Sequence, residues 1–239
     1  MSTQRSTVSA RKPLSENDPS RTSTTPTGAP QSWMELHEPR VLFILTCVAM
    51  VVSFIGCAEV KIWFMEAAPV LVAIPFLLLR YRKFRLTPLL YRLMFLHSLI
   101  LLGGAHYTYA KVPIGFWFQR MFNLKRNHYD RLGHFAQGFV PAILAREVLI
   151  RKEAVRKGAW LNGIVICICA ACSAYYEIVE WWTAASGADD SGDFMGSQGD
   201  IYDAQWDMFL CVVGACCSLV FLSEKHDEQL AKIKRNEKF

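Results

Sequence analysis

Six apolar stretches, separated by polar and charged connections, dominate the middle of this chain of 239 residues. A transmembrane helix needs about 20 mostly apolar residues to cross the hydrocarbon core of a bilayer. Each stretch approaches that length, and only 20% of the sequence is charged. The pattern predicts an all-α integral membrane protein, a bundle of about six transmembrane helices, rather than a soluble domain. The expected spans are Val41–Ala58, Trp63–Leu79, Leu93–Ala110, Arg131–Ile150, Trp160–Trp182 and Ile201–Leu222.

Two polar segments flank this membrane domain, which covers residues 41–222. Residues 1–40 are rich in Ser, Thr and Pro, a composition typical of a disordered tail. A transit peptide is the alternative, but Glu16 and Asp18 count against it, because such segments are poor in acidic residues. Residues 223–239 are mostly charged or polar and are expected to form a solvated tail.

Lys and Arg are distributed unevenly among the connections. They gather in both tails and in residues 80–92 and 151–157, whereas residues 183–200 contain none. Cytoplasmic loops carry the excess of Lys and Arg, so this distribution predicts that both termini are cytoplasmic. One connection on the outer side breaks the pattern, and its aromatic residues suit the membrane interface. Its basic residues are Lys111, Arg120, Lys125 and Arg126, and its aromatic residues are Phe116, Trp117, Phe118 and Phe122.

All eight cysteines lie inside the apolar stretches. There they act as small hydrophobic residues that permit close helix packing. Cys169 and Cys172 have the C-x-x-C spacing, but a redox pair needs solvent access and the electropositive start of a helix. Their position in mid-span therefore favours packing over redox or metal chemistry.

Ionisable residues gather toward the outer end of the predicted bundle. Asp130 and His134 are four residues apart at the start of the fourth span, so they share a helix face. Glu177 and Glu180 share a face near the end of the fifth span. The other residues expected at this level are Asp200, Asp203 and Asp207 at the start of the sixth span, together with Gln198, Arg131, Glu66 and His106.

The charges in this group do not balance. Six of the carboxylates face only Arg131 and a protonated His134 as nearby cations. Ionisable groups at membrane depth are costly and usually face the bundle interior or a water-filled cavity. The group therefore needs shared protons, a bound metal or a cationic ligand. The simpler alternative is a wet rim in which Asp200 and Asp203 stabilise a helix N-terminus.

A divalent metal ion is one of the expectations that this group raises. One neutral histidine with several carboxylates suits zinc, manganese or iron. The sequence contains no H-E-x-x-H or E-x-x-H motif, so the donor set is compatible with a metal without identifying one. The residues available as ligands are His134, Glu177, Glu180, Asp203 and Asp207.

Arg146 and Glu147 form an adjacent charged pair near the cytoplasmic end of the fourth span. Long charged side chains near a helix end can extend to the interface and leave their stems in the apolar layer. That explanation is the simpler one, and a buried pair between helices is the alternative.

Three motifs carry a family resemblance. The first is D-R-L-G-H-F at 130–135, followed by Q-G-F-V-P-A at 137–142 and A-R-E at 145–147. The second is Y-E-I-V-E-W-W at 176–182, and the third is G-S-Q-G-D-I-Y-D-A-Q-W-D-M at 196–208. With these motifs the chain resembles the YjdF-like family of uncharacterised bacterial inner-membrane proteins over about residues 40–222. The resemblance implies a multi-pass protein of the bacterial inner membrane with no assigned reaction.

A looser similarity runs to VanZ-like membrane proteins, which are associated with glycopeptide resistance. Their D-K-x-x-H-F-like motif is matched here by D-R-L-G-H-F at 130–135, and their later helix acid by Glu177 or Glu180. Their D-x-x-x-N-x-x-G pattern is matched at Asp203, but Asp207 stands in place of Asn and Leu210 in place of Gly. This similarity implies work at the cell envelope.

Together, the residues and the resemblances predict an extracytoplasmic site that binds or acts on an envelope lipid or a lipid-linked precursor. His134 would be a base or a metal ligand oriented by Asp130. Alternatives are a small proton-coupled transporter and a non-catalytic membrane partner subunit. Membrane lipids are the expected partners, and nucleic acid is not, because no basic groove with solvent-facing aromatics is present. Glu177 and Glu180 join His134 and Asp130 as candidate catalytic residues. Glu177, Glu180, Asp203 and Asp207 would hold a cation or carry protons, and the expected ligand-binding residues are Gln198, Arg131, Asp200, Asp203 and Asp207.

Overall fold

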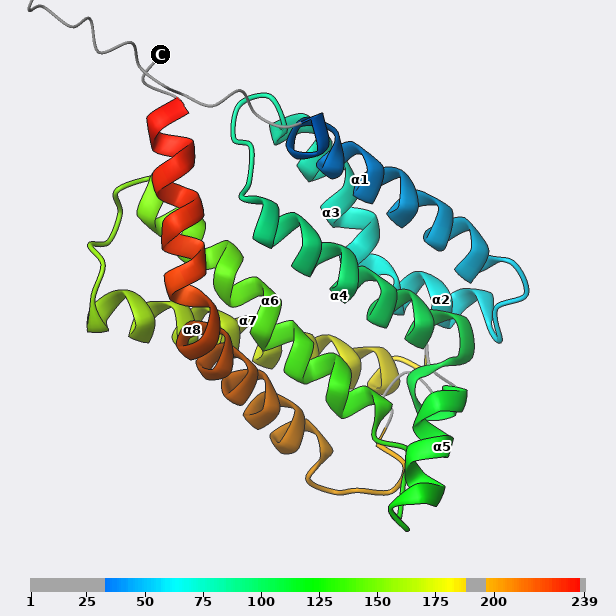
Figure 1. Ribbon diagram of the computed structural model, residues 1–239. Helices are drawn as coiled ribbons and strands as arrows, with labels where there is room; N and C mark the ends of the chain where they lie inside the picture. Colours follow the sequence, from blue (N-terminus) through cyan, green and yellow to red (C-terminus); the bar gives the residue numbers. More distant parts are fainter. Residues whose placement is uncertain (1–32, 188–196, 237–239) are drawn as a thin grey trace, which may run out of the picture. The chain divides into compact units, whose positions relative to one another are not determined.

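A computed structural model describes residues 33–187 and 197–236, which contain helices and connections and no strand. The described elements all belong to one compact unit. Figure 1 shows the order of the helices along the chain. They are α1 Trp33–Phe54, α2 Val60–Glu66, α3 Ala68–Arg80, α4 Pro88–Tyr107, the short 3-10 helix η1 Tyr109–Lys111, α5 Pro113–Met121, α6 Tyr129–Arg151, α7 Ala159–Ala185 and α8 Asp203–Asn236.

Four of the described helices are long and apolar enough to cross a membrane: α1, α4, α7 and α8. The pair α2 and α3 passes the same test together, with a bend of 51° between its two helices. The sequence predicted Trp63–Leu79 as a single span, but this segment is broken into two helices. Pro69 explains the break, because proline is favoured in the first turn of a helix and cannot continue the one before it.

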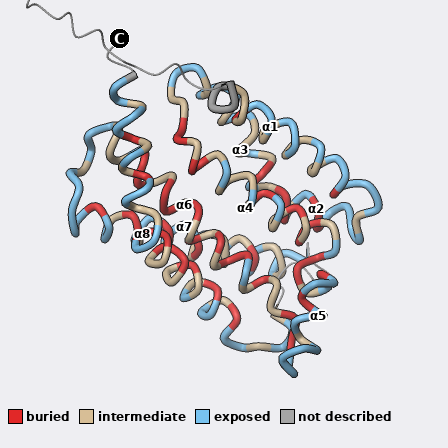
Figure 2. Tube along the Cα trace, in the orientation of Figure 1, coloured by how far each residue is buried: buried red, intermediate tan, exposed pale blue. Residues whose placement is uncertain are grey.

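The central helix α6 is as long as a span but carries many polar residues. It has 23 residues and packs against α4, α7 and α8. Figure 1 shows α6 between α4 and α8, and Figure 2 shows buried positions along much of its length. Neighbouring helices therefore shield its polar side chains from lipid. Four helices, or five with the bent pair, meet the length and composition test, so the predicted number of six spans is not confirmed.

The contact between α6 and α8 depends on glycine. A Cβ added at Gly138 would lie 1.8 Å from the backbone oxygen of Cys211, and one at Gly214 would lie 2.1 Å from the backbone oxygen of Phe135. Cys211 of α8 lies in this contact, and Cys169 of α7 packs beside it; both are free thiols of one buried apolar cluster. The small residues therefore allow the two backbones to approach closely, as the packing role of the cysteines predicted.

Two helices extend beyond their expected ends. Helix α1 begins at Trp33, eight residues before the predicted start of the first span. Helix α8 continues past Leu222 to Asn236, and His226 and Leu230 on it are buried. A wholly solvated tail from residue 223 is therefore wrong, because one face of this segment packs on the bundle. The rest of the predicted N-terminal tail, residues 1–32, lies outside the described residues.

Candidate functional site

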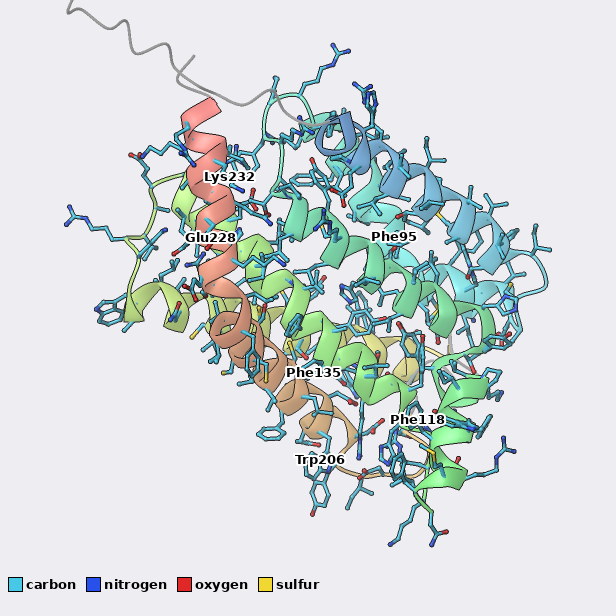
Figure 3. All side chains as sticks on the ribbon, in the orientation of Figure 1. Phe95, Phe118, Phe135, Trp206, Glu228 and Lys232 are labelled. Carbon is cyan, nitrogen blue, oxygen red and sulfur yellow. The ribbon has the colours of Figure 1, made fainter. Side chains whose placement is uncertain are left out.

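The candidate site lies where α6 begins, α7 ends and α8 begins. These three helices contact one another, so the polar side chains at these ends are brought together. Figure 1 shows this end of the bundle beside α5, and Figure 3 places Trp206 and Phe118 here. We call it the acidic end. The opposite end, where Glu228 and Lys232 lie on α8, is the basic end (Figure 3).

Four side chains form an inner cluster: Asp130 and His134 from α6, Glu177 from α7 and Asp207 from α8. One ligand atom each from Asp130, His134 and Asp207 lies within 4.8 Å of the other two. His134 Nε2 lies 3.5 Å from Asp130 Oδ1, and His134 Nδ1 lies 3.6 Å from Glu177 Oε1. Both separations exceed a good hydrogen bond, so the imidazole is not tightly bonded to either carboxylate.

Several polar atoms of this inner cluster are buried without a hydrogen-bond partner. They are His134 Nδ1, Glu177 Oε1 and Asp207 Oδ1. Asp207 is only 2% exposed and His134 only 4%. A buried polar atom without a partner costs free energy, so three in one place make this cluster the strongest candidate for a binding site among the described residues.

Glu180 and Tyr176 of α7 lie beside the inner cluster. Glu180 is buried and lies within electrostatic range of Glu177, Asp130 and Asp207. The His134 and Tyr176 rings meet edge to face at 6.2 Å. Glu180 is thus a fourth carboxyl group close to these three. The group therefore needs bound protons or a cation to neutralise it.

Tyr109 stands between two helices at this end. Its ring fills the space beside Gly104 of α4 and Gly133 of α6, where an added Cβ would lie 2.5 Å and 2.9 Å from ring atoms. Burial raises the pKa of the Tyr109 phenol well above its ordinary value, and nearby Tyr176 and Glu66 raise it further. Tyr109 is therefore a neutral group that spaces α4 from α6.

Two arginines hold the outer acids and form a rim around the inner cluster. Arg126 makes a buried ion pair with Asp203, and Arg131 Nη2 lies 2.7 Å from Asp200 Oδ2. Arg126 also lies 3.7 Å from Asp200. The backbone N–H of Tyr202 donates to Asp200 and, with both arginines nearby, lowers the pKa of the Asp200 carboxyl. Asp200 and Asp203 are thus already paired with arginines, and Asp203 remains within electrostatic range of Asp130, Glu177 and Asp207.

Gln198 fastens the loop before α8 to the start of α6. Its Oε1 accepts from the backbone N–H of Asn127 at 3.0 Å, and its Nε2 donates to the backbone oxygen of Asn127 at 2.8 Å. Asn127 in turn donates to the backbone oxygen of Val112. Gln198 therefore positions the rim, and its side chain is occupied by the protein's own backbone.

The structure sorts the residues that the sequence singled out. His134, Glu177 and Asp207 lie in one cluster, but the tight three-residue set consists of Asp130, His134 and Asp207 and does not include Glu177. Asp203, expected among the metal ligands, is instead engaged by Arg126. His106 lies elsewhere, with its Nδ1 2.8 Å from the backbone oxygen of Ser53.

Arg126 is the functional residue that the sequence reasoning missed. It was counted only as a basic residue on the wrong side of the membrane, and Arg131 and His134 were taken as the nearby cations. Its unexpected place in an outer connection could have identified it, because an arginine on an otherwise acidic face suggests that a specific carboxylate pairs with it. Its buried pair with Asp203 supplies the reason for its position.

A second polar network occupies the basic end. Glu147 is fully buried and accepts from the backbone N–H of Thr87, while its Oε2 lies 3.1 Å from His226 Nε2. Arg146 Nη1 lies 2.9 Å from His226 Nδ1 and 2.8 Å from Asp227 Oδ1. Arg146 and Glu147 are therefore buried interhelical groups, and the simpler interfacial explanation is wrong for them.

The chemistry available differs between the two ends. At the basic end, the network fastens α8 to α6 and to the start of α4. At the acidic end, one imidazole and several carboxylates converge with unused donor and acceptor positions. Such a donor set can coordinate a divalent cation of the first transition row or exchange protons.

Comparisons with known proteins agree with this architecture. The family model described as "Predicted membrane protein (DUF2238)" matches residues 38–228. Inner membrane protein YjdF of Escherichia coli (strain K12) is 48% identical over 170 residues, which cover 71% of this chain and 81% of that protein. No solved structure matches. This chain therefore belongs to the DUF2238 family of membrane proteins and is a multi-pass protein of the bacterial inner membrane.

Proposed function

We propose that this protein binds a divalent metal ion in the inner cluster and uses it to engage the phosphate of an envelope lipid or lipid-linked precursor. The observation that carries the proposal is the convergence of Asp130, His134 and Asp207 within 4.8 Å of one another. Unsatisfied atoms of His134 and Asp207 at the same place support it.

The pairing of charges favours a cation over a plain acidic rim. Asp200 and Asp203 are held by arginines, whereas the ion pairs recorded for Asp130 and Glu177 are both with His134. One imidazole cannot neutralise several buried carboxylates. A divalent ion would supply two positive charges and would accept the donor atoms that hydrogen bonds leave unused.

The expected orientation of the protein in the membrane and the affinity of a metal for phosphate together suggest an envelope lipid as the ligand. The distribution of Lys and Arg favours cytoplasmic termini, which would put the acidic end at the extracytoplasmic face. Helix α5 exposes Trp117 and Phe118 at this end, as an interfacial helix does. A metal held by Asp130, His134 and Asp207 would leave coordination positions for a phosphate oxygen, and Glu177, which lies outside that set of three, would be the carboxylate placed to accept a proton there.

The test is the metal and lipid content of the purified full-length protein. Wild type, His134→Ala, Asp207→Asn and Glu180→Gln are purified in mild detergent, with Glu228→Gln as the control carboxylate far from the cluster. Elemental analysis and lipid mass spectrometry are then run on each sample. We expect a stoichiometric first-row metal in wild type and the control, and its loss in His134→Ala and Asp207→Asn.

Each outcome decides between functions. Loss of metal together with loss of a co-purified phospholipid supports the whole proposal. A wild-type protein that stays metal-free after zinc, manganese and iron are offered contradicts the metal site. In that case the same carboxylates favour a proton relay, and a pH-driven uptake assay with Glu180→Gln would replace the metal measurement.

A further inference from the structure

A separate apolar cavity of about 780 Å³ lies between α1, α3, α4 and α6. Its walls include Phe43, Ala73, Met94, Leu101 and Leu144. Volumes of roughly 300–1,000 Å³ are typical of sites that hold a small organic ligand. The cavity shares no residue with the inner cluster or the rim, so an occupant would be a second ligand.

Polar groups in the wall are mostly satisfied by their own helices. The hydroxyl of Ser98 donates to the backbone oxygen of Phe95, and that of Thr46 donates to the backbone oxygen of Leu42. His97 also lines the cavity, and its Nε2 is buried without a hydrogen-bond partner. The body of the cavity therefore suits a hydrocarbon chain, with one polar contact available at His97.

The cavity is cationic where it reaches the basic end. Arg40, Arg82 and Lys83 belong to its lining and all three are solvent-exposed, and no carboxylate lines it within residues 33–187 and 197–236. Glu38, which lies close to Arg40 in sequence, is engaged by Arg92. The mouth therefore presents three cations to an anionic group.

The flank around the cavity faces the apolar layer of the membrane. Ile44 and Val48 on α1 and Val72 and Phe76 on α3 are more than half exposed. Helix α1 is long and apolar enough to cross the membrane, and α3 meets the same test together with α2. A ligand can therefore enter sideways from the bilayer, which favours a membrane lipid over a water-soluble metabolite.

We infer that this cavity binds one acyl chain of an anionic phospholipid, whose headgroup phosphate is held by Arg40, Arg82 and Lys83. The apolar walls select the chain, and the three cations select the negative headgroup. Basic clusters at the membrane surface recognise anionic lipids in the same way. With cytoplasmic termini, the lipid comes from the inner leaflet.

The test uses native mass spectrometry of the full chain after removal of lipid in detergent. Phosphatidylglycerol and phosphatidylcholine of equal chain length are titrated separately. Ala73→Phe fills the cavity, and Val72→Phe is its control, because Val72 is exposed beside the cavity without lining it. Arg82→Gln with Lys83→Gln removes charge at the mouth, and Lys232→Gln with Lys234→Gln removes the same charge from exposed positions on α8.

We expect wild type and both controls to bind one phosphatidylglycerol in preference to phosphatidylcholine. Ala73→Phe should lose the lipid, and the Arg82/Lys83 variant should bind phosphatidylglycerol roughly 10- to 30-fold more weakly. Equal binding of both lipids by wild type would overturn the anionic selection. Unchanged binding in Ala73→Phe, or a protein dimer that Ala73→Phe abolishes, would overturn the lipid as occupant.

Discussion

His134 Nδ1 on α6 faces Glu177 Oε1 on α7 across 3.6 Å, and neither atom has a hydrogen-bond partner in the described part of the chain. The two atoms are too far apart for a good hydrogen bond. The Nε2 atom of the same ring lies 3.5 Å from Asp130 Oδ1, so each nitrogen of the imidazole has a carboxylate near it.

The first prediction concerns competition between metal and protons at this position. Metal ligands must be deprotonated, so acid should displace a bound ion. We expect the affinity for Zn²⁺, measured by competition with a fluorescent chelator, to fall roughly tenfold or more from about pH 7.5 to about pH 5.5. Glu177→Gln should weaken binding and flatten this dependence. A pH-independent affinity would contradict coordination by these side chains.

The second prediction concerns Arg126 at the rim. Arg126→Gln leaves the buried Asp203 carboxylate without its ion-pair partner, which should lower the free energy of unfolding by roughly 3 kcal/mol. Lys125→Gln removes the same charge from the exposed neighbouring residue and should change stability by less than about 0.5 kcal/mol. Denaturant unfolding followed by tryptophan fluorescence measures both.

A double variant separates the ion pair from other effects of Arg126. Arg126→Gln combined with Asp203→Asn removes the uncompensated charge and should recover most of the lost stability. If the double variant is as unstable as Arg126→Gln alone, the pair with Asp203 is not the source of the loss.

The third prediction concerns the contact between α6 and α8. Alanine at Gly138 would bring its Cβ within 1.8 Å of the Cys211 backbone oxygen, so the helices must separate. We expect a loss of about 1–3 kcal/mol, the usual cost of overpacking. Gly163→Ala on α7 is the matched control, since nothing lies within 4 Å of its added Cβ. Helix propensity makes that change neutral or favourable by up to ~1 kcal/mol. Equal effects of the two variants in thermal unfolding would refute the close contact.

The sequence predicted the helical class and most of the acidic end because both depend on local patterns. Apolar runs of membrane length identify helices, and residues spaced by three or four positions identify shared faces. His134, Glu177 and Asp207 could be grouped in this way from three separate helices. The break at Ala67 was missed because hydropathy alone does not register a bend, although Pro69 was visible in the sequence.

Such local patterns could not predict ion pairs and hydrogen bonds between residues far apart in the sequence. Arg126 meets Asp203 across 77 positions, and Arg146 meets His226 across 80. Charge counting weighed acids against the cations nearest in sequence, so it could not decide which acids were already neutralised. The charged composition after residue 222 likewise gave no sign that α8 continues to Asn236 with one buried face. In the described part of this segment, His226 and Leu230 are the buried residues of that face.

The fourth prediction concerns the pH dependence that Asp200 contributes. The backbone N–H of Tyr202 and the guanidinium of Arg131 lower its carboxyl pKa below the ordinary 3.8. The stability that these contacts supply is therefore complete above pH 3.8 and is lost as the pH falls through the lower folded value. We expect wild type to exceed Asp200→Asn in melting temperature at pH 7 and the difference to shrink below about pH 4. A difference that grows in acid would reverse the sign and reject this account.

The fifth prediction concerns Glu147 and His226 at the basic end. His226 Nδ1 lies beside Arg146 Nη1, which can only donate, so Nδ1 accepts; Nε2–H is then free to donate to Glu147 Oε2. His226→Leu removes both contacts and leaves two buried charged groups short of a partner. We expect a loss of roughly 3 kcal/mol, with α8 released from Asp227 onward.

Hydrogen exchange of residues 223–236 measures that release separately from global unfolding. Glu147→Gln should loosen the same segment, because a neutral amide oxygen accepts from His226 Nε2–H more weakly than the carboxylate does. Glu228→Gln changes an exposed carboxylate on the same helix and should leave exchange unchanged. If His226→Leu leaves this segment as protected as wild type, apolar packing around Leu230 holds it, and the buried network fixes α6 without anchoring the end of α8.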